Sequence, residues 1–164
     1  ILPLFPDESY MLVQKTPNIR FHLPNCSNIG SRDSDPSADI IGLHTDAEFG
    51  HPTEEINIII PLTDMNASNS IYYEPFPHSG LHPLDYSNVA IKRNQFFIGY
   101  FNACNHYNRI NTTDTTRVSF DIRIIRGSMW NANKYDNSSV SKQTKFDVGH
   151  YYMIIHKKHF GLVQ

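Results

Sequence analysis

The sequence predicts an all-β fold, a double-stranded β-helix of the jelly-roll type with few flanking helices. Short runs of β-branched and aromatic residues recur at intervals of roughly ten residues, with clusters of Gly, Pro, Asn and Ser between them. No stretch before residue 126 places its apolar residues at helical intervals over ten or more positions. Repeated short strands without intervening helices are typical of sandwiches and barrels rather than of α/β proteins.

The expected strands follow one another along the chain, with turn-forming segments between them. Strands are expected at residues 10–13, 19–24, 43–49, 55–63, 70–76, 89–101 and 116–125. The segment 89–101 is consistent with two strands, or with one strand that bends near Asn94. Loops are expected at residues 25–39, 64–69, 78–88, 102–116 and 127–145, and the final residues 145–164 fit either a strand or a short helix.

Residues 116–125 have the clearest alternation of polar and apolar residues in the chain. Each kind occupies one face of a strand: Arg117, Ser119, Asp121 and Arg123 against Val118, Phe120, Ile122 and Ile124. We expect Arg117 and Ser119 to face the interior of the jelly roll. We also expect the opposite face to be buried at Val118, Phe120 and Ile122.

Length and composition indicate one domain. A chain of 164 residues is long enough to bury a core, and we expect residues 1–164 to form a single jelly-roll domain. Its core is expected at about residues 19–126, with residues 127–164 as a tail packed on it. The chain starts at Ile1 rather than Met, so we expect that residues can precede it.

Charge and hydropathy narrow the classes of partner. A formal net charge of −2 without long runs of one sign argues against nucleic acid or an anionic membrane as partner. No apolar stretch approaches the ~20 residues of a membrane-spanning helix, and no signal-peptide pattern opens the chain. Two cysteines, Cys26 and Cys104, do not make a disulfide framework. We therefore expect a cytoplasmic protein that acts on a small molecule.

The sequence His44-Thr45-Asp46 is the strongest candidate for a metal site. Residues two apart on an extended segment point to the same side, so the imidazole and the carboxylate can reach one metal ion together. His106, in the polar loop before the strand 116–125, is the best candidate for a third ligand. Two histidines and one carboxylate on one face of a metal, with other positions open, are typical of non-haem Fe(II) oxygenases.

Arg117 and Ser119 are candidates for binding the cosubstrate of such a site. A strand-borne arginine can bind a carboxylate bidentately, and a serine hydroxyl beside it can donate another hydrogen bond. This pair suits the distal carboxylate of a 2-oxo diacid whose keto-acid end chelates the metal. Arg123, on the same strand face, is the less favoured alternative. Asn57 is a further candidate, which either bonds the oxoacid or caps a turn.

This ordered set resembles the Fe(II)/2-oxoglutarate-dependent dioxygenases, whose fold is the double-stranded β-helix. The segments HTDAEFGHPTEEINIIIPLTD, NSIYYEP and CNHYNRINTTDTTRVSFDIR are similar to the phytanoyl-CoA-hydroxylase-like branch, and most similar to its streptomycin-biosynthesis (StrG-like) dioxygenases. The resemblance spans roughly residues 19–126. It implies that the iron ligands are His44, Asp46 and His106 and that 2-oxoglutarate is bound by Arg117 and Ser119.

The resemblance also implies a reaction. Iron, 2-oxoglutarate and O₂ would together oxidise a small-molecule substrate, with release of succinate and CO₂, while the protein positions the reactants and excludes water. In the related halogenases a small residue replaces the carboxylate ligand and leaves room for chloride. Because Asp46 is present here, hydroxylation, desaturation or cyclisation is expected instead.

Two other classes of protein remain possible on the same residues. A cupin-type metal enzyme without an oxoacid shares the jelly roll, but it usually has more histidine ligands and needs no Arg-x-Ser pair. A jelly-roll carbohydrate-binding module fits the Asn- and Tyr-rich loops, but it does not require the ordered ligand set. Three more residues are weighed as contacts to substrate or to the ligands, against ordinary structural roles: His51, Glu48 and Glu74.

Overall fold

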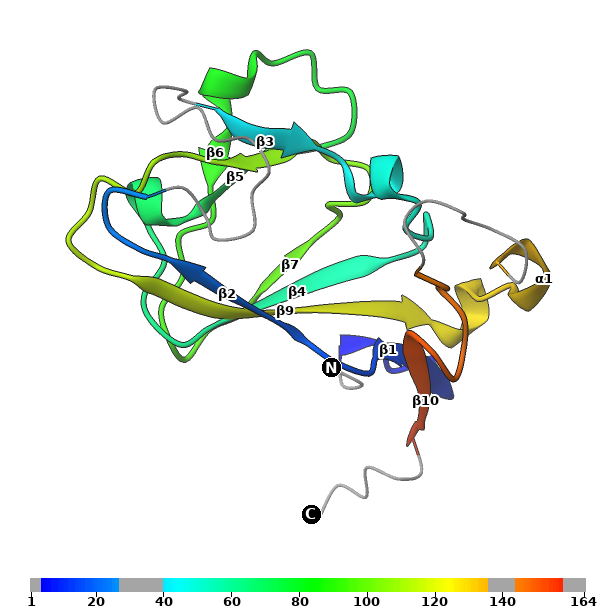
Figure 1. The fold of residues 1–164 in the computed structure, drawn as a ribbon. Coiled ribbons are helices and arrows are strands. Elements are labelled where there is room, and N and C mark those ends of the chain that lie inside the picture. Colours follow the sequence, from blue (N-terminus) through cyan, green and yellow to red (C-terminus); the bar gives the residue numbers. More distant parts are fainter. Residues whose placement is uncertain (1–3, 27–39, 136–143, 158–164) are drawn as a thin grey trace.

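The computed structural model describes residues 4–26, 40–135 and 144–157, and two antiparallel β-sheets make up most of this part of the chain (Figure 1). The larger sheet contains β1 (Tyr10–Gln14), β2 (Asn18–His22), β4 (Ile56–Pro61), β7 (Phe97–Gly99), β9 (Arg117–Arg126) and β10 (Tyr152–His156). The smaller contains β3 (Ile41–His44), β5 (Ile71–Tyr73), β6 (Ser87–Asn88) and β8 (His106–Asn108). Figure 1 shows the smaller sheet stacked over the larger one. The expected all-β fold of the jelly-roll type is confirmed, although the sheets do not close into a barrel.

The long strand β9 organises the larger sheet. One of its edges pairs with β4 from Ser119 to Ile124, and the other edge pairs with β2 along its first half and with β1 along its second half. The alternation seen in the sequence therefore sets the two faces of the sheet. The face toward the smaller sheet, called the inner face below, carries Arg117, Ser119, Asp121 and Arg123, all at most 7% exposed.

The opposite, outer face of the larger sheet is apolar. Ile56, Ile58 and Ile124 form a buried cluster there with Met11, and Ile60, Ile98 and Ile122 pack against its edge. Val118, Phe120 and Ile122 are only half-buried, which corrects the expectation that they would be buried. The reason is that none of the described elements covers this part of the face, so Ile19 and Phe21 of the neighbouring strand β2 remain 49% and 41% exposed.

A hollow of about 310 Å³ opens on this outer face. Its lining is largely apolar and includes Leu4, Ile58, Ile60 and Phe96. Ile58 and Ile60 alternate along β4 with Asn57 and Ile59, which belong to the inner face. The hollow therefore lies on the side of the sheet away from the candidate metal ligands.

The tail after β9 returns to the larger sheet. Strand β10 pairs with β1 from Tyr10 to Gln14, so the final segment forms a strand rather than a helix. Tyr152 and Phe146 pack with Leu12 and Ile125 into a second buried cluster. Between β9 and this tail lie two short helices, η5 (Gly127–Met129) and α1 (Ala132–Tyr135), where a loop was expected.

The strand before the candidate ligands is shorter than expected. β3 ends at His44, and Asp46 begins the 3₁₀ helix η2 (Asp46–Phe49) rather than continuing the strand. The Glu48 carboxylate accepts hydrogen bonds from the backbone and hydroxyl of Thr45, and Gly50 ends the helix at φ 81°, a conformation that favours glycine. Thr45 itself is extended, so the side chains before and after it still point to one side.

The expected break near Asn94 in the segment 89–101 is confirmed, although the segment contains less strand than expected. Only Phe97–Gly99 forms a strand within it, because residues 92–95 make a tight turn. In this turn the Gln95 backbone N–H donates to Lys92 O, and the Lys92 N–H donates to the Gln95 side chain. The expected loop at 25–39 lies mostly outside the described residues. Two further 3₁₀ helices complete the described elements, η3 (Ala67–Asn69) and η4 (Pro83–Asp85). No helix in the described ranges is long and apolar enough to cross a bilayer.

Candidate metal centre

His44, Asp46 and His106 come together at one end of the smaller sheet. His44 is the last residue of β3 and lies opposite His106, the first residue of β8. Asp46 Oδ1 lies 3.9 Å from Nε2 of His44 and 3.8 Å from Nε2 of His106. Ligand atoms that each bind one ion at about 2.0–2.2 Å lie roughly 3–4 Å apart, so this spacing fits a shared metal ion.

Both imidazoles are oriented by backbone carbonyls. Nδ1 of His44 donates to the carbonyl of Gly42, and Nδ1 of His106 donates to the carbonyl of Cys104 over 3.2 Å. A ring whose Nδ1 donates carries its lone pair on Nε2, which is the atom that faces Asp46 in both residues. Gly42 reaches this position at φ 67°, beside a register shift in β3, which explains the glycine one residue after Ile41.

Aromatic side chains fix the planes of the two rings. Phe101 stacks on His106 at 4.4 Å with an interplanar angle of 16°, and Phe49 contacts His44 edge-on at 4.9 Å. The Phe101 carbonyl also accepts a hydrogen bond from the backbone N–H of Asp46 over 2.8 Å. His106 is buried, whereas 28% of the His44 side chain is exposed, so the centre is open to solvent on the His44 side.

The two carboxylate oxygens of Asp46 have different surroundings. Oδ2 accepts hydrogen bonds from Asn57 Nδ2 at 2.9 Å and from Arg123 Nε and Nη2 at 3.1 and 3.0 Å. Oδ1 has only the two imidazole Nε2 atoms near it among the contacts described. One oxygen is therefore held by the protein, and the other is directed toward the position that a metal would occupy.

The pKa values of Asp46 and His106 favour the binding of a cation. Burial alone would raise the pKa of the Asp46 carboxyl, but the charge of Arg123 and the bond from Asn57 outweigh it, and the pKa lies well below its usual range. Burial lowers the pKa of His106 to about 4, against the attraction of Asp46. At neutral pH the centre therefore offers one carboxylate and a neutral His106 imidazole, the forms that bind metals.

The arginines of β9 occupy different parts of the inner face. Arg123 binds Asp46, and it also lies 3.5 Å from Glu55 and 3.6 Å from Asp121. Arg117 and Ser119, the predicted cosubstrate ligands, are each 1% exposed on the same face, farther from Asp46 along the strand. Burial lowers the pKa of Arg117 to about 10, which leaves it charged at neutral pH. Their role toward a cosubstrate stays a prediction.

The other polar candidates have structural partners. Asn57 was weighed as an oxoacid ligand; its Nδ2 donates to Asp46, and a contact to an oxoacid stays a prediction. His51 donates to Glu55 over 2.8 Å, and Glu48 binds Thr45. Glu74 is buried, and its carboxylate is satisfied there by four hydrogen bonds from Ser79 and Asn105.

Sequence reasoning missed Glu55 and Tyr152. Glu55 is 1% exposed and accepts hydrogen bonds from Tyr152 and His51. A glutamate at the start of an apolar strand gives no signal that distinguishes it from a surface residue. Asn57 was detectable, because an amide inside the run INIII contradicts burial unless it has a polar partner.

The chain resembles one known protein in sequence and two solved structures in fold. The sequence is 30% identical over 142 residues to the streptomycin biosynthesis protein StrG of Streptomyces griseus, which covers 85% of this chain and 58% of that protein. The chain thus spans little more than half the length of this relative. No protein-family model matches the sequence.

Two solved structures of the non-haem monooxygenase ThoJ, a nickel complex and an apo form, match the fold with TM-scores of 0.53 and 0.56. The chain shares their fold. Identity over the matched region is 20% and 18%, and the matches cover 72% of this chain but only 45% and 47% of theirs.

Proposed function

We propose that this chain forms the catalytic part of a non-haem Fe(II) oxygenase that uses 2-oxoglutarate and O₂ to hydroxylate a small molecule. The observation that carries the proposal is the convergence of His44, Asp46 and His106. The protein binds Nδ1 of each imidazole and Oδ2 of the carboxylate, while the two Nε2 atoms and Oδ1 face one position. Two imidazoles and one carboxylate on one face are the ligand set of this class.

The interior beside this position supports the proposal. Three buried side-chain oxygens have no hydrogen-bond partner within the described residues: Asn57 Oδ1, Asn108 Oδ1 and Asp121 Oδ1. All three belong to strand faces that point between the sheets, as judged by the alternation along β4, β8 and β9. Buried polar atoms without protein partners are expected where solvent or a ligand fills the space.

Arg117 and Ser119 are proposed to bind the distal carboxylate of 2-oxoglutarate. They share the inner face with Arg123, which touches Asp46, and the α-carbons of the two arginines are separated by roughly 20 Å along the strand. 2-Oxoglutarate bound at the metal and an extended Arg117 side chain can together bridge this interval. The guanidinium would bind the carboxylate as a planar pair of donors.

Bound iron, with 2-oxoglutarate and O₂, would supply the oxidising chemistry that places oxygen on a substrate carbon with release of succinate and CO₂. The residues of this chain position and shield that chemistry. His44 and His106 present Nε2, Asp46 presents Oδ1, and Asn57 and Arg123 keep Asp46 from rotating. Phe101 covers one side of His106 and limits access of water from that side.

The comparisons support the class and suggest the role. StrG is a biosynthesis protein, and the matched ThoJ structures are non-haem monooxygenases, one of them with nickel. We propose the phytanoyl-CoA-hydroxylase-like branch on the motifs of residues 44–64, 69–75 and 104–123. A biosynthetic intermediate is the proposed substrate class.

The test is a metal and cosubstrate assay on the purified protein. We expect one Fe(II) bound per chain, and slow succinate formation that requires Fe(II), 2-oxoglutarate and O₂ together. His106→Ala should abolish both, while His150→Ala, at an exposed histidine that bonds Asp147, should change neither. O₂ consumption without any 2-oxoglutarate would favour a cupin-type enzyme, and absence of metal binding would favour a binding module.

A further inference from the structure

A buried polar network continues from Asp46 to the C-terminal tail. Glu55 lies at its centre, with a fully buried side chain. Its Oε1 accepts a hydrogen bond from the Tyr152 hydroxyl, and its Oε2 accepts one from His51 at 2.8 Å and lies 3.5 Å from Arg123 Nε. Arg123 in turn binds Asp46 Oδ2. An unbroken chain of contacts therefore runs from β10, through Glu55 and Arg123, to the candidate metal carboxylate.

Arg123 can fix the orientation of Asp46 only if other residues restrain its own side chain. Its side chain is long and has many rotamers, and a single carboxylate would let it slide between Oδ2 and Oδ1. Asp121 lies 3.6 Å from Nη1 on another edge of the guanidinium, and Glu55 lies 3.5 Å from Nε, the atom that also donates to Asp46. Together they restrain it to one plane and offset its positive charge, which would otherwise repel a cation at the centre.

Glu55 in turn depends on the tail. A buried carboxylate is costly unless hydrogen-bond donors satisfy it. Tyr152, which is 0% exposed, supplies one such donor, and burial together with Glu55 keeps the pKa of its hydroxyl well above the usual range, so the hydroxyl retains its proton. Phe146 of the same tail packs on the ring of His51 at 4.3 Å, and so covers the other donor.

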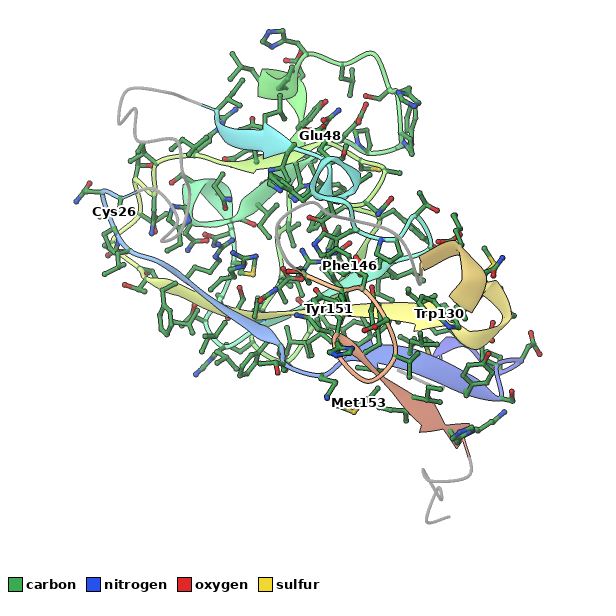
Figure 2. The ribbon with its side chains drawn as sticks, turned by 45° about the vertical axis from the view of Figure 1, so that its right-hand side comes forward. Cys26, Glu48, Trp130, Phe146, Tyr151 and Met153 are labelled. Atoms are coloured by element: carbon green, nitrogen blue, oxygen red, sulfur yellow. The ribbon has the colours of Figure 1, made fainter. Side chains whose placement is uncertain are left out.

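Figure 2 shows Phe146 and Tyr151 on the tail segment beside the larger sheet, and Trp130, which packs against the same buried cluster, near the end of β9. Tyr151 contacts both Phe146 and Tyr152 edge-on, with ring centroids 4.8 Å apart in each pair. The aromatic side chains of the tail thus pack over the polar network around Glu55.

We propose that Tyr152 is a positioning residue of the metal centre: through Glu55 and Arg123 it fixes the orientation of Asp46. The tail is then a working part of the site. This inference rests on the proposed metal centre, and it concerns only the geometry of the carboxylate. Without the Tyr152 hydroxyl, Glu55 would turn toward Arg123 to recover a donor, and Arg123 would move away from Oδ2.

Cobalt(II) is the probe, because it binds mixed imidazole and carboxylate sites and its visible absorption bands report coordination geometry. Tyr152→Phe should raise the dissociation constant for Co(II) about threefold to tenfold and shift these bands. The effect should be smaller than the 10–100-fold typical of a group bonded directly to a ligand. Glu55→Gln, one step closer to Asp46, should weaken Co(II) about tenfold or more.

Tyr10→Phe is the matched control. Its hydroxyl donates to Gly127 O at 3.0 Å, and its ring packs against the same buried cluster as Tyr152, but it has no contact with the network among the described residues. Both tyrosine variants should lower the melting temperature by similar small amounts. Only Tyr152→Phe should change Co(II) affinity and spectrum.

The outcomes separate the two proposals. If the unmodified protein binds Co(II), and Tyr152→Phe and Glu55→Gln match Tyr10→Phe in affinity and spectrum, the positioning role is wrong while the metal centre stands. If the unmodified protein binds no metal, both proposals are wrong. Should Tyr152→Phe not fold, Glu55→Gln decides the question, because it keeps the shape of the side chain and an acceptor for Tyr152.

Discussion

The two oxygens of Asp46 have different surroundings: the protein holds Oδ2, and Oδ1 faces the candidate metal position. The two buried arginines of β9 lie at different positions along the inner face. Arg123 donates twice to Asp46 Oδ2. Arg117 lies farther along the same inner face, opposite His22 of β2. Substitutions at the two positions should therefore have separable effects.

Arg117→Ala should weaken 2-oxoglutarate binding by about 2–5 kcal/mol, because it leaves a buried carboxylate without its charged partner. Co(II) affinity should stay unchanged in this variant. Arg123→Ala should instead lower Co(II) affinity about 10–100-fold, because it removes two hydrogen bonds from a metal ligand. Calorimetric titration of each variant, with Co(II) first and 2-oxoglutarate second, measures both effects. Loss of 2-oxoglutarate binding in Arg123→Ala alone, with metal affinity intact, would show that Arg123 is the oxoacid anchor.

Gly42→Ala tests the carbonyl that orients His44. A side chain at φ 67° strains the backbone by about 1 kcal/mol, and we expect relief of that strain to turn the Gly42 carbonyl away from His44 Nδ1. Co(II) affinity should therefore fall. Gly80→Ala is the control, since it has a similar φ of 74° in open space. A melting temperature lowered in both variants, with Co(II) affinity lowered only at Gly42, is the expected result.

At the scale of elements, Glu8 connects the segment before β1 to the turn after β9. Its carboxylate accepts hydrogen bonds from Ser128 Oγ at 2.5 Å, from the Ser128 backbone at 2.9 Å and from Arg126 Nε at 3.0 Å. These contacts fix η5 at the point where the chain leaves the larger sheet. They therefore set the direction in which the tail departs.

Glu8→Gln should lower the free energy of unfolding by about 1–3 kcal/mol at pH 7, because it weakens bonds to a buried charged acceptor. The bonds from Ser128, together with Arg126, hold the pKa of Glu8 below its usual value of 4.5. A carboxyl whose pKa is lower in the folded state stabilises the protein above its unfolded pKa, and this contribution is lost as the pH falls through the folded value. The difference between the two proteins should therefore shrink below about pH 4.5.

The partly exposed pair of Glu54 and Lys134, with side chains 15% and 47% exposed, provides the comparison for Glu8. Glu54→Gln should change stability by less than about 1 kcal/mol, as is usual for surface ion pairs. Urea unfolding from pH 7 down to pH 3.5 measures both variants. A Glu8 effect that is constant over this range would contradict the ionic origin assigned to it.

Sequence patterns predicted the strands that depend on periodicity better than the strand ends that depend on local side-chain bonds. The alternation of residues 116–125 and the apolar run of β4 were recognisable, because strand faces repeat every two residues. The early end of β3 was not, because it depends on bonds from the Glu48 side chain to the backbone. The break near Asn94 was expected, but the Gln95 side-chain bond that fixes it was not.

The candidate site shows the same division. The order of His44, Asp46 and His106 along the chain was enough to propose that they meet, and the structure brings them together. The roles of Arg123 and Glu55 could not be predicted, because both follow from strand pairing between distant segments. Asn57 lies opposite Arg123 only when β4 and β9 are in their observed register.

At the scale of the whole molecule, the outer face of the larger sheet should bind apolar molecules. Phe21 and Ile19 are 41% and 49% exposed beside half-buried Val118 and Phe120, so the exposed apolar residues are contiguous there. Phe21→Lys should lower the fluorescence of a bound apolar dye and reduce aggregation at high concentration. Its Co(II) affinity should remain unchanged, because the metal ligands lie on the other face.

Leu84→Lys is the matched change, because Leu84 is 44% exposed in η4, away from the larger sheet. It should affect dye binding much less than Phe21→Lys. Equal effects of the two variants would mean that the outer face has no special affinity for apolar molecules.

Strand β9 has its charged residues on the inner face and its apolar residues on the outer face. This arrangement determines where the chain can gain or lose a residue. A codon inserted before Arg117 would be absorbed by the polar loop and leave both faces of the strand as they are. One inserted after Ser119 would exchange the faces, so that Ile122 would meet Asp46 and Arg123 would take the buried place of Ile124 in the apolar cluster. Such a protein would bury a charged arginine among apolar side chains, which is unfavourable, and nothing would hold its Asp46 carboxylate. Insertions and deletions among relatives should therefore occur upstream of Arg117. In an alignment, the segment from Arg117 to Arg123 should have a constant length.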